Sequence, residues 1–359
     1  MLPVKTRIAI IGGFLGAGKT TLATKIATQL QKMDKSVAII TNDQGEALVD
    51  TQYSKSLGFD VSEVLRGCFC CRFPDFLRSA RTLVSSARPD IILAEPVGSC
   101  TDLLATVVAP LKAIYPNEFE VAPLMILVDS TRLLSDIIDS ATPGDYLRRH
   151  QIEEGEVIVL SKTDMVPKER VRELEDIIRK INPKATIVSY SSMSGTGLGK
   201  LIDNVSSNKV STSHPVEIDY DIYAAAEAEL GWYNGSFKLT LPDKTDAYDM
   251  AMRVLRSISD EYKEDDIAHV KLMLTSETNA LKMSLVCQSV NVDGVKGSRY
   301  GKGPSSLTVN ARVVSSPEKL KDVVRKAVTY SLEHLGLRAD SFEDDSFSPS
   351  RPQPTHKMR

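Results

Sequence analysis

The sequence lacks features that would place it in two large classes of protein. Its 44 lysine and arginine residues do not outnumber its 47 acidic residues, and the net charge is −3 at pH 7. A protein built to grip nucleic acid usually carries a basic excess, so we expect no nucleic-acid partner. No apolar run approaches the roughly 18 residues needed to span a bilayer, so we expect no membrane association either.

Cysteine and histidine are scarce, with five of each among 359 residues. An odd number of cysteines does not indicate a disulfide framework, and clustered thiols in a reducing compartment more often serve metal or redox chemistry. The N-terminal stretch has two basic residues and an apolar run, but it lacks the small-residue cleavage site of a signal peptide. We therefore expect a cytoplasmic protein.

Short apolar runs alternate with amphipathic stretches from about residue 7 to 205. The runs are rich in Val, Ile, Leu and Ala and do not alternate with polar residues, as expected for strands buried on both faces of a parallel sheet. They span residues 7–12, 36–41, 90–95, 122–129, 156–161 and 185–190. This order predicts an α/β fold over residues 1–203, with a doubly wound, mostly parallel sheet.

A different pattern follows residues 204–217, which are polar and predict a linker. The strands expected there span residues 235–241, 269–275, 280–287 and 306–314, and the helices span 246–262 and 317–335. This order predicts a smaller C-terminal α+β domain over residues 218–337. Residues 291–306 are glycine-rich and indicate a mobile loop. The charged, proline-containing residues 338–359 are expected to be disordered.

A phosphate-binding loop follows the first expected strand. The stretch GFLGAGKT, residues 13–20, fits G-x-x-x-x-G-K-[ST] in full and precedes a helix. Its backbone N–H groups would surround phosphate oxygens, Lys19 would reach the β- and γ-phosphates, and the Thr20 hydroxyl would bind Mg²⁺. The predicted nucleotide contacts here are Gly13, Gly16, Ala17, Gly18, Lys19, Thr20 and Thr21.

Two later segments indicate the base. The stretch SKTD at the end of a strand resembles the NKxD box of GTPases, with Ser161 in place of Asn. In that box Asp164 would accept hydrogen bonds from guanine N1 and N2, and Lys162 would pack on the ring. The stretch SSMSGTG resembles the loop whose backbone reads guanine O6, which makes Ser192 a predicted contact. These features favour GTP over ATP, while Ser161 in place of Asn predicts a weakened bridge toward guanine N7 and the phosphate loop.

Acidic and glycine residues after two strands indicate hydrolysis. Glu95 ends one expected strand, where its carboxylate can hold the Mg²⁺ shell or position water, and Gly98 can offer its N–H to the γ-phosphate. Lys19, Glu95 and Gly98 are therefore the predicted catalytic residues. In the acidic loop that follows the second expected strand, Asp50 is the candidate for the Mg²⁺ sphere. Glu46 is a candidate ligand for another metal, and a solvated loop is its competing interpretation.

Three of the five cysteines lie within the stretch GCFCC, as Cys68, Cys70 and Cys71. Thiolates are soft ligands that suit Zn²⁺, Co²⁺, Ni²⁺ or Cu⁺. Structural zinc sites usually draw on two separated ligand pairs, so a single tight cluster predicts a site that holds a metal transiently. Glu46, water or a partner's side chain could complete it. The competing interpretation is buried apolar packing, and Cys100 receives little weight as a further ligand.

Together these motifs resemble a known family. The stretches GGFLGAGKTTL, NDQGE, GCFCC, EPVG and SKTD occur in the order and spacing of the CobW-type GTPases, P-loop proteins related to the nickel-insertion GTPases of urease and hydrogenase maturation. The resemblance implies a GTPase metallochaperone. GTP and Mg²⁺ would organise the C-x-C-C site for a transition metal, Zn²⁺ or Co²⁺, and hydrolysis would release it to a client metalloprotein or cofactor-assembly protein. Carried over by position, Cys68, Cys70 and Cys71 become metal ligands, Lys19 and Thr20 phosphate and Mg²⁺ contacts, and Asp164 the guanine reader.

Two other hypotheses stay open at this point. One is a GTP-gated regulatory or reactivating chaperone for a cofactor-dependent enzyme, such as a corrinoid protein, without metal transfer. The other is an ATP- or GTP-dependent kinase, which is weaker because the sequence shows no separate base for a substrate hydroxyl. The family loops usually read NEFGE and ETTG where this chain has NDQGE and EPVG. These differences leave the metal and the client open. The oligomeric state is also open, and a homodimer is one possibility.

Overall fold

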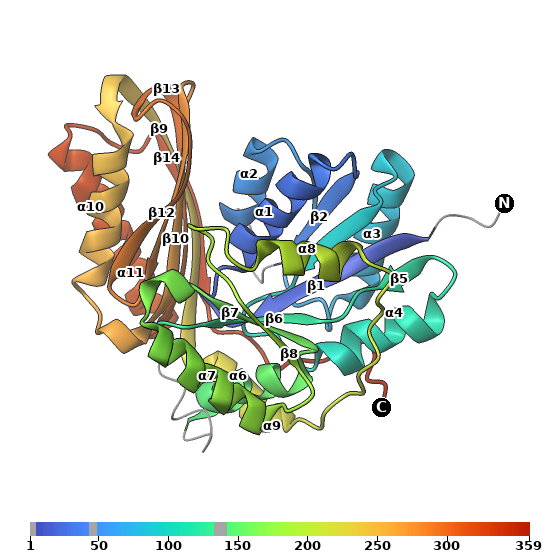
Figure 1. The fold of residues 1–359 in the computed structure, drawn as a ribbon. Helices are drawn as coiled ribbons and strands as arrows, with labels where there is room; N and C mark the ends of the chain where they lie inside the picture. Colours follow the sequence, from blue (N-terminus) through green and yellow to red (C-terminus); the bar gives the residue numbers. More distant parts are fainter. Residues whose placement is uncertain (1–4, 43–48, 133–141) are drawn as a thin grey trace. The chain divides into compact units, whose positions relative to one another are not determined.

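The computed structural model describes most of the chain as two compact units (Figure 1). The described residues are 5–42, 49–132 and 142–359. The first unit is formed by residues 1–44, 58–226 and 351–359, and the second by residues 45–57 and 227–350. No helix in these described ranges combines the length and the apolar character needed to cross a membrane.

A parallel sheet of eight strands forms the centre of the first unit (Figure 1). Its order is β3-β2-β4-β1-β6-β7-β8, and β5 also pairs with β1. Neighbours that are not consecutive in sequence require crossovers, which helices supply. The strands are β1 (Thr6–Gly13), β2 (Val37–Asn42), β3 (Asp60–Val64), β4 (Ile91–Glu95), β5 (Phe119–Val121), β6 (Met125–Asp129), β7 (Val157–Ser161) and β8 (Thr186–Ser189).

Helices cover both faces of this sheet. α1 (Lys19–Gln31) and α8 (Leu198–Ser206) pack on the face that carries Ala9, Ile11 and Leu127. On the opposite face, α6 (Pro143–Glu154) is followed by Gly155, where a Cβ would lie 2.4 Å from Ile158 Cδ1 and 3.0 Å from Ile126 Cγ1. The doubly wound prediction is thus confirmed. The remaining helical segments are α3 (Phe73–Ala87), η1 (Leu104–Val108), α4 (Ala109–Ile114), η2 (Thr163–Met165), α7 (Lys168–Ile181) and α9 (Tyr220–Ala228).

An antiparallel sheet forms the second unit, with the order β12-β11-β10-β13-β9-β14. Alternate residues of its strands, such as Leu272 in β10, pack against the helices α10 and α11, as expected for a sheet with two different faces. The short helix α2 (Val49–Ser56) contacts β10, β11 and β13. The other elements are β9 (Leu230–Asp246), α10 (Ala247–Ser259), η3 (Glu264–Asp266), β10 (Ile267–Thr275), β11 (Asn279–Val286), β12 (Ser289–Gly297), β13 (Tyr300–Val314), α11 (Pro317–His334) and β14 (Ser341–Phe347).

Three stretches differ from the sequence prediction. Residues 204–217 are not a separate linker, because α8 extends to Ser206 and the first unit continues to residue 226. Residues 291–306 are not a loop, because most of them lie in β12 and β13. Gly294 is required within β12, since a Cβ there would lie 2.3 Å from the Tyr53 hydroxyl of α2.

The expected disorder of residues 338–359 is also wrong. Residues 341–347 form β14, which pairs antiparallel with β9. Phe342 stacks on Phe237 with ring centroids 5.6 Å apart, and Phe347 stacks on Trp232 at 6.2 Å. These two aromatic side chains give an otherwise polar tail enough apolar surface to order it.

Candidate nucleotide and metal site

The phosphate loop adopts a backbone that only glycine tolerates. Gly13, Gly16 and Gly18 have φ of 126°, 80° and 94°, values that L side chains rarely adopt. A Cβ on Gly13 would also lie 2.4 Å from the carbonyl oxygen of Leu127 in β6. Gly18 directly precedes α1, so the loop ends at the positive pole of a helix. This is the arrangement that binds phosphate groups.

Lys19, Thr20 and Glu95 lie at the start of α1 and the end of β4. The ammonium group of Lys19 donates to the carbonyl oxygens of Gly13 at 2.8 Å and Phe14 at 3.3 Å. The Thr20 hydroxyl donates to Glu95 Oε1 at 2.8 Å, and both side chains are buried. A hydroxyl beside a carboxylate gives Mg²⁺ two oxygen atoms of the kind it prefers.

Gly98 lies directly against the phosphate loop. A Cβ at this position would meet Leu15 Cδ2 at 2.6 Å and the Leu15 backbone nitrogen at 3.0 Å. Gln151 of α6 holds the segment by donating to the carbonyl oxygens of Gly98 at 3.0 Å and Cys100 at 2.8 Å. The stretch after β4 is therefore fixed between the phosphate loop and a helix.

The two segments expected to read the base are tied together. Thr163 donates its backbone N–H and its hydroxyl to the carbonyl oxygen of Tyr190, at 3.3 and 3.1 Å. Lys162 forms an ion pair with Asp129 at 2.6 Å. Asp164 lies in the short turn η2 with its side chain exposed, and Ser192 is partly buried. An exposed carboxylate on an anchored turn is available to a ligand.

Ser161 connects these segments to the phosphate loop. Its buried hydroxyl donates to the carbonyl oxygens of Ala17 at 2.8 Å and Val128 at 3.2 Å. Ser161 therefore bridges β7 and the phosphate loop although it replaces Asn. A weakened contact with guanine N7 stays a prediction.

The C-x-C-C segment lies between β3 and α3 and is held by Asn42 at the end of β2. The Asn42 amide donates to the carbonyl oxygens of Val64 at 2.9 Å and Gly67 at 2.7 Å, and its oxygen accepts the Phe69 N–H at 2.9 Å. Sequence reasoning missed this role for Asn42. Its signal was the presence of a polar side chain at the carboxyl end of a buried strand, where α/β folds place their sites.

The three thiols of this segment meet at one point. The sulfur atoms of Cys68, Cys70 and Cys71 all lie within 4.8 Å of one another. Cys71 Sγ is 3.3 Å from Cys68 Sγ and 3.8 Å from Cys70 Sγ. Zinc with a Zn–S distance near 2.3 Å and tetrahedral geometry places its sulfur ligands about 3.8 Å apart. The cluster therefore fits a soft metal ion with small adjustments.

Cys100 joins this cluster from the segment after β4. Its side chain is fully buried and is hydrogen-bonded to the thiols of Cys68 and Cys70. Hydrogen bonds from Cys100, Cys70 and Cys71 hold the pKa of Cys68 well below its usual range. The pKa of Cys71 is raised to about 11, chiefly by its hydrogen bond to Cys68. Cys68 therefore has the most lowered pKa of the group, and the little weight given to Cys100 was an underestimate.

Residues 351–359 contact the C-x-C-C segment directly. Thr355 donates its N–H to the carbonyl oxygen of Cys70 at 2.9 Å and its hydroxyl to that of Cys71 at 3.2 Å. The Gln353 N–H donates to Cys71 Sγ at 3.1 Å. The His356 ring packs edge-on against Phe73, with centroids 4.9 Å apart. Sequence composition gave no signal for these contacts.

A buried polar network supports the segment just after Cys100. The Thr101 hydroxyl lies 2.7 Å from His150 Nδ1 and 3.0 Å from Glu154 Oε1, while Glu154 Oε2 accepts the Leu104 N–H at 3.1 Å. Burial raises the pKa of Glu154 to about 8 and lowers that of His150. Both side chains are neutral at pH 7, which suits a water-excluded network.

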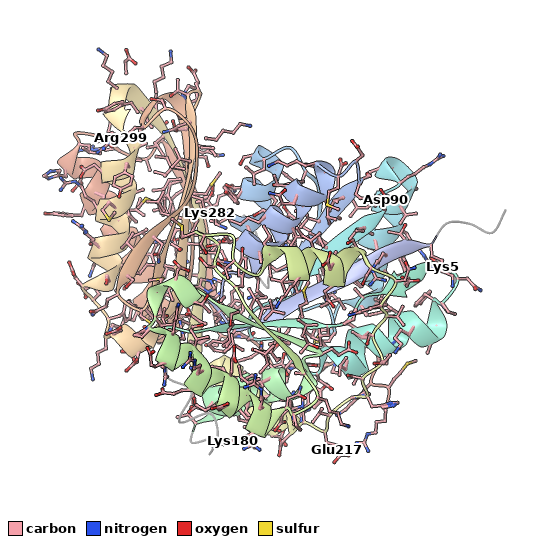
Figure 2. All side chains as sticks on the ribbon, in the orientation of Figure 1. Lys5, Asp90, Lys180, Glu217, Lys282 and Arg299 are labelled. Atoms are coloured by element: carbon pink, nitrogen blue, oxygen red, sulfur yellow. The ribbon has the colours of Figure 1, made fainter. Side chains whose placement is uncertain are left out.

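The two predicted acidic metal ligands have other outcomes. Glu46 lies outside the described residues, so its role stays a prediction. Asp50 belongs to the second unit, where its carboxylate pairs with Lys271 and, at 3.0 Å, with Lys282 (labelled in Figure 2). Burial would raise the pKa of Asp50, but the two ammonium groups outweigh it and hold that pKa well below its usual range. A structural ion cluster thus replaces the expected Mg²⁺ role of Asp50.

Comparisons with known proteins match the part of the chain that contains the phosphate loop and the C-x-C-C segment. A family model described as "CobW/HypB/UreG, nucleotide-binding domain" matches residues 7–189, about half of the chain. Zinc-regulated GTPase metalloprotein activator 1 of Dictyostelium discoideum is 26% identical over 224 residues, covering 51% of this chain and 45% of the relative.

Two bacterial proteins are also similar to this chain in sequence. Zinc chaperone CobW of a Sinorhizobium species is 28% identical over 266 residues, covering 63% of this chain and 73% of the relative. Zinc chaperone YeiR of Escherichia coli K12 is 28% identical over 173 residues, covering 47% and 50%. The chain thus spans about half the length of the Dictyostelium and Escherichia relatives.

Proposed function

This chain belongs to the CobW/HypB/UreG family, and from that membership we propose that it is a GTP-hydrolysing metallochaperone. GTP with Mg²⁺ binds the phosphate loop, and the nucleotide controls a transition-metal site at Cys68, Cys70 and Cys71. The metal is the cargo of the protein, which it passes to a client metalloprotein or cofactor-assembly protein.

The nucleotide half of this proposal assigns a task to each side chain near the phosphate loop. Lys19 leaves its two carbonyl partners to neutralise the β- and γ-phosphates. Thr20 and Glu95, already 2.8 Å apart, hold Mg²⁺, which would offset the charge on the phosphate oxygens. The backbone N–H of Gly98 faces the γ-phosphate, and the Asp164 carboxylate accepts the two donors on the guanine edge.

The metal half rests on the sulfur geometry. Three thiols within 4.8 Å, one of them with a lowered pKa, form a soft-ligand site. Zinc is the metal we propose, because two relatives bear the name zinc chaperone. A cytoplasmic, reducing setting is part of the proposal, since thiol ligands bind metal only while they stay reduced.

The observation that carries the proposal is the connection between the two sites. Glu95 bonds to the phosphate loop, Gly98 packs against it, and Cys100 touches the thiol cluster, all within six residues. A γ-phosphate that moves this short stretch would move a thiol as well. Nucleotide state and metal affinity are then properties of one segment.

The nucleotide half can be tested by changing the base that the protein accepts. The Asp164→Asn variant should lose about tenfold or more in GTP affinity, because a charged hydrogen bond contributes about 1.5–3 kcal/mol. It should gain affinity for xanthosine triphosphate, whose extra carbonyl accepts from the new amide. The control is Asp176→Asn, on the exposed surface of α7. If the Asp164→Asn variant binds GTP with unaltered affinity, the assignment of Asp164 to the guanine base is wrong.

GTP hydrolysis gives a second test of the nucleotide site. Lys19→Ala should abolish GTP turnover, while Lys25→Ala, exposed on the same helix, should leave it unchanged.

A further inference from the structure

We propose that Cys100 is a fourth thiolate ligand of the metal, and that it is the ligand through which bound nucleotide controls the site. This inference rests on the proposed function and extends it in two ways. It completes the coordination of the cargo ion, for which the C-x-C-C segment supplies only three sulfur atoms. It also names the side chain that joins metal binding to the phosphate loop.

The first support is the position of the Cys100 thiol. It forms hydrogen bonds with Cys68 and Cys70, which belong to the segment between β3 and α3, whereas Cys100 follows β4. The side chain is 0% exposed, so the contact takes place away from water. Together with the three thiols of the C-x-C-C segment, it would supply the four sulfur donors of a Cys₄ zinc site.

The second support is the open position that three ligands leave. A tetrahedral ion bound by Cys68, Cys70 and Cys71 needs one further donor. Among the residues that the structure describes, these three form the one group of metal-binding side chains whose ligand atoms lie within 4.8 Å of one another. Cys100 lies outside that group but forms hydrogen bonds with two of its members, so a movement towards Cys71 would make it the fourth ligand.

The third support is what holds Cys100 on either side. Before it, Gly98 packs on Leu15 of the phosphate loop so tightly that no side chain fits. Gln151 binds the carbonyl oxygens of Gly98 and Cys100 together. After it, Thr101 is fixed by His150 and Glu154. Residues 98–100 are therefore held as one short segment between the phosphate loop and α6.

This arrangement explains how one phosphate can act on one ligand. The three C-x-C-C thiols lie between β3 and α3, whereas Cys100 follows β4 and the nucleotide contacts. A shift of residues 98–100 towards a γ-phosphate would change the distance of Cys100 from the other three sulfur atoms. The ion would have four sulfur ligands in one nucleotide state and three in the other, with lower affinity in the second.

The direct test counts sulfur ligands in the unaltered protein. Reduced full-length protein is loaded with Zn²⁺ in the presence of Mg²⁺ and a non-hydrolysable GTP analogue, and its zinc X-ray absorption is measured. We expect four sulfur scatterers near 2.3 Å with the analogue and three with GDP. Three sulfur ligands in both states would overturn the proposal without any variant being made.

A variant series separates this inference from the proposed function. Cys100→Ser should raise the Zn²⁺ dissociation constant in the GTP-analogue state by at least about tenfold, since even changes outside the ligand set can cost that much. Cys287→Ser, in the second unit, is the matched control and should change nothing. Binding of the labelled GTP analogue by Cys100→Ser shows that the variant is folded.

The outcomes are distinguishable. If Cys70→Ser abolishes binding but Cys100→Ser retains full affinity and its nucleotide dependence, Cys100 is a buried apolar residue and this inference fails while the proposed function stands. If Cys70→Ser also binds Zn²⁺ normally, the proposed metal site itself is wrong. Loss of affinity in Cys100→Ser confined to the GTP-analogue state supports both.

Discussion

Glu154 shows at the scale of one residue how burial sets chemistry near the site. The side chain is 1% exposed, and its carboxyl oxygens accept hydrogen bonds from the Thr101 hydroxyl and the Leu104 N–H. Burial raises its pKa to about 8 from an ordinary 4.5. The Thr101 hydroxyl donates to Glu154 Oε1, the Leu104 N–H donates to Oε2, and the Thr101 oxygen also lies 2.7 Å from His150 Nδ1.

This shift predicts how stability varies with pH. Below about pH 4.5, Glu154 carries its proton in both the folded and the unfolded chain. Between about pH 4.5 and 8, the unfolded chain has released this proton while the folded chain still holds it. The free energy of unfolding of the first unit should therefore fall by roughly 4 kcal/mol between about pH 4.5 and 8 on account of this group. The Glu154→Gln variant, which keeps the hydrogen bonds, should lack that part of the fall.

Hydrogen exchange of peptides from the first unit, followed in urea at several pH values, measures this difference. Glu173→Gln, exposed on α7, is the control and should follow the wild type. Parallel pH curves for wild type and Glu154→Gln would show that Glu154 is ionised in the folded protein.

Single residues were predictable where a motif fixes the backbone around them. The roles of Lys19 and Thr20 follow from the phosphate-loop pattern, because three glycines with positive φ fix the backbone conformation of the loop. Cys100 and Asn42 did not follow, because each acts on a segment that is distant in sequence. The carboxylate of Asp50 looked like a Mg²⁺ ligand until Lys271, 221 residues away, supplied its partner.

At the scale of elements, the tail of residues 351–359 packs over part of the C-x-C-C segment. It is held by backbone hydrogen bonds to Cys70 and to the sulfur of Cys71, by the ion pair of Arg351 with Asp221, and by Lys357 above the Tyr220 ring at 4.3 Å. Cys71 is the thiol it covers, and Cys71 is also the least buried of the three.

Removal of this element should expose Cys71. A chain that ends at residue 350 should react with iodoacetamide at Cys71 roughly tenfold faster or more, because three hydrogen bonds of about 1 kcal/mol each no longer oppose access. Mass spectrometry of the labelled peptide gives the rate. The control is Thr355→Ser, which keeps the N–H and hydroxyl donors. An unchanged rate in the shortened chain would show that the tail leaves Cys71 open.

The helices and strands of the first unit were predictable where they are continuous apolar runs. All six expected strands are present; five are buried along their whole length, and β8 is only partly buried at the edge of the sheet. β3 was missed because its sequence DVSEV is not a continuous apolar run, and β5 because it has three residues. The tail and β12 were missed because their order comes from contacts with distant strands.

At the scale of the whole molecule, the sequence predicted two domains of the right classes and misplaced their limits. Residues 45–57 belong to the second unit and residues 351–359 to the first. Neither assignment has a local signature, because each depends on partners more than two hundred residues away, such as Lys282 for Asp50 and Cys71 for Gln353.

The central claim for the whole molecule is that nucleotide controls the thiol site. Its most direct test is a titration of reduced full-length protein with Co²⁺, followed by the thiolate charge-transfer absorbance, with GDP or with Mg²⁺ and a non-hydrolysable GTP analogue. We expect a strong tetrahedral thiolate spectrum and tight binding with the analogue, and at least about tenfold weaker binding with GDP, a difference of about 1.4 kcal/mol. A titration curve and spectrum that are the same in both nucleotide states would contradict the account.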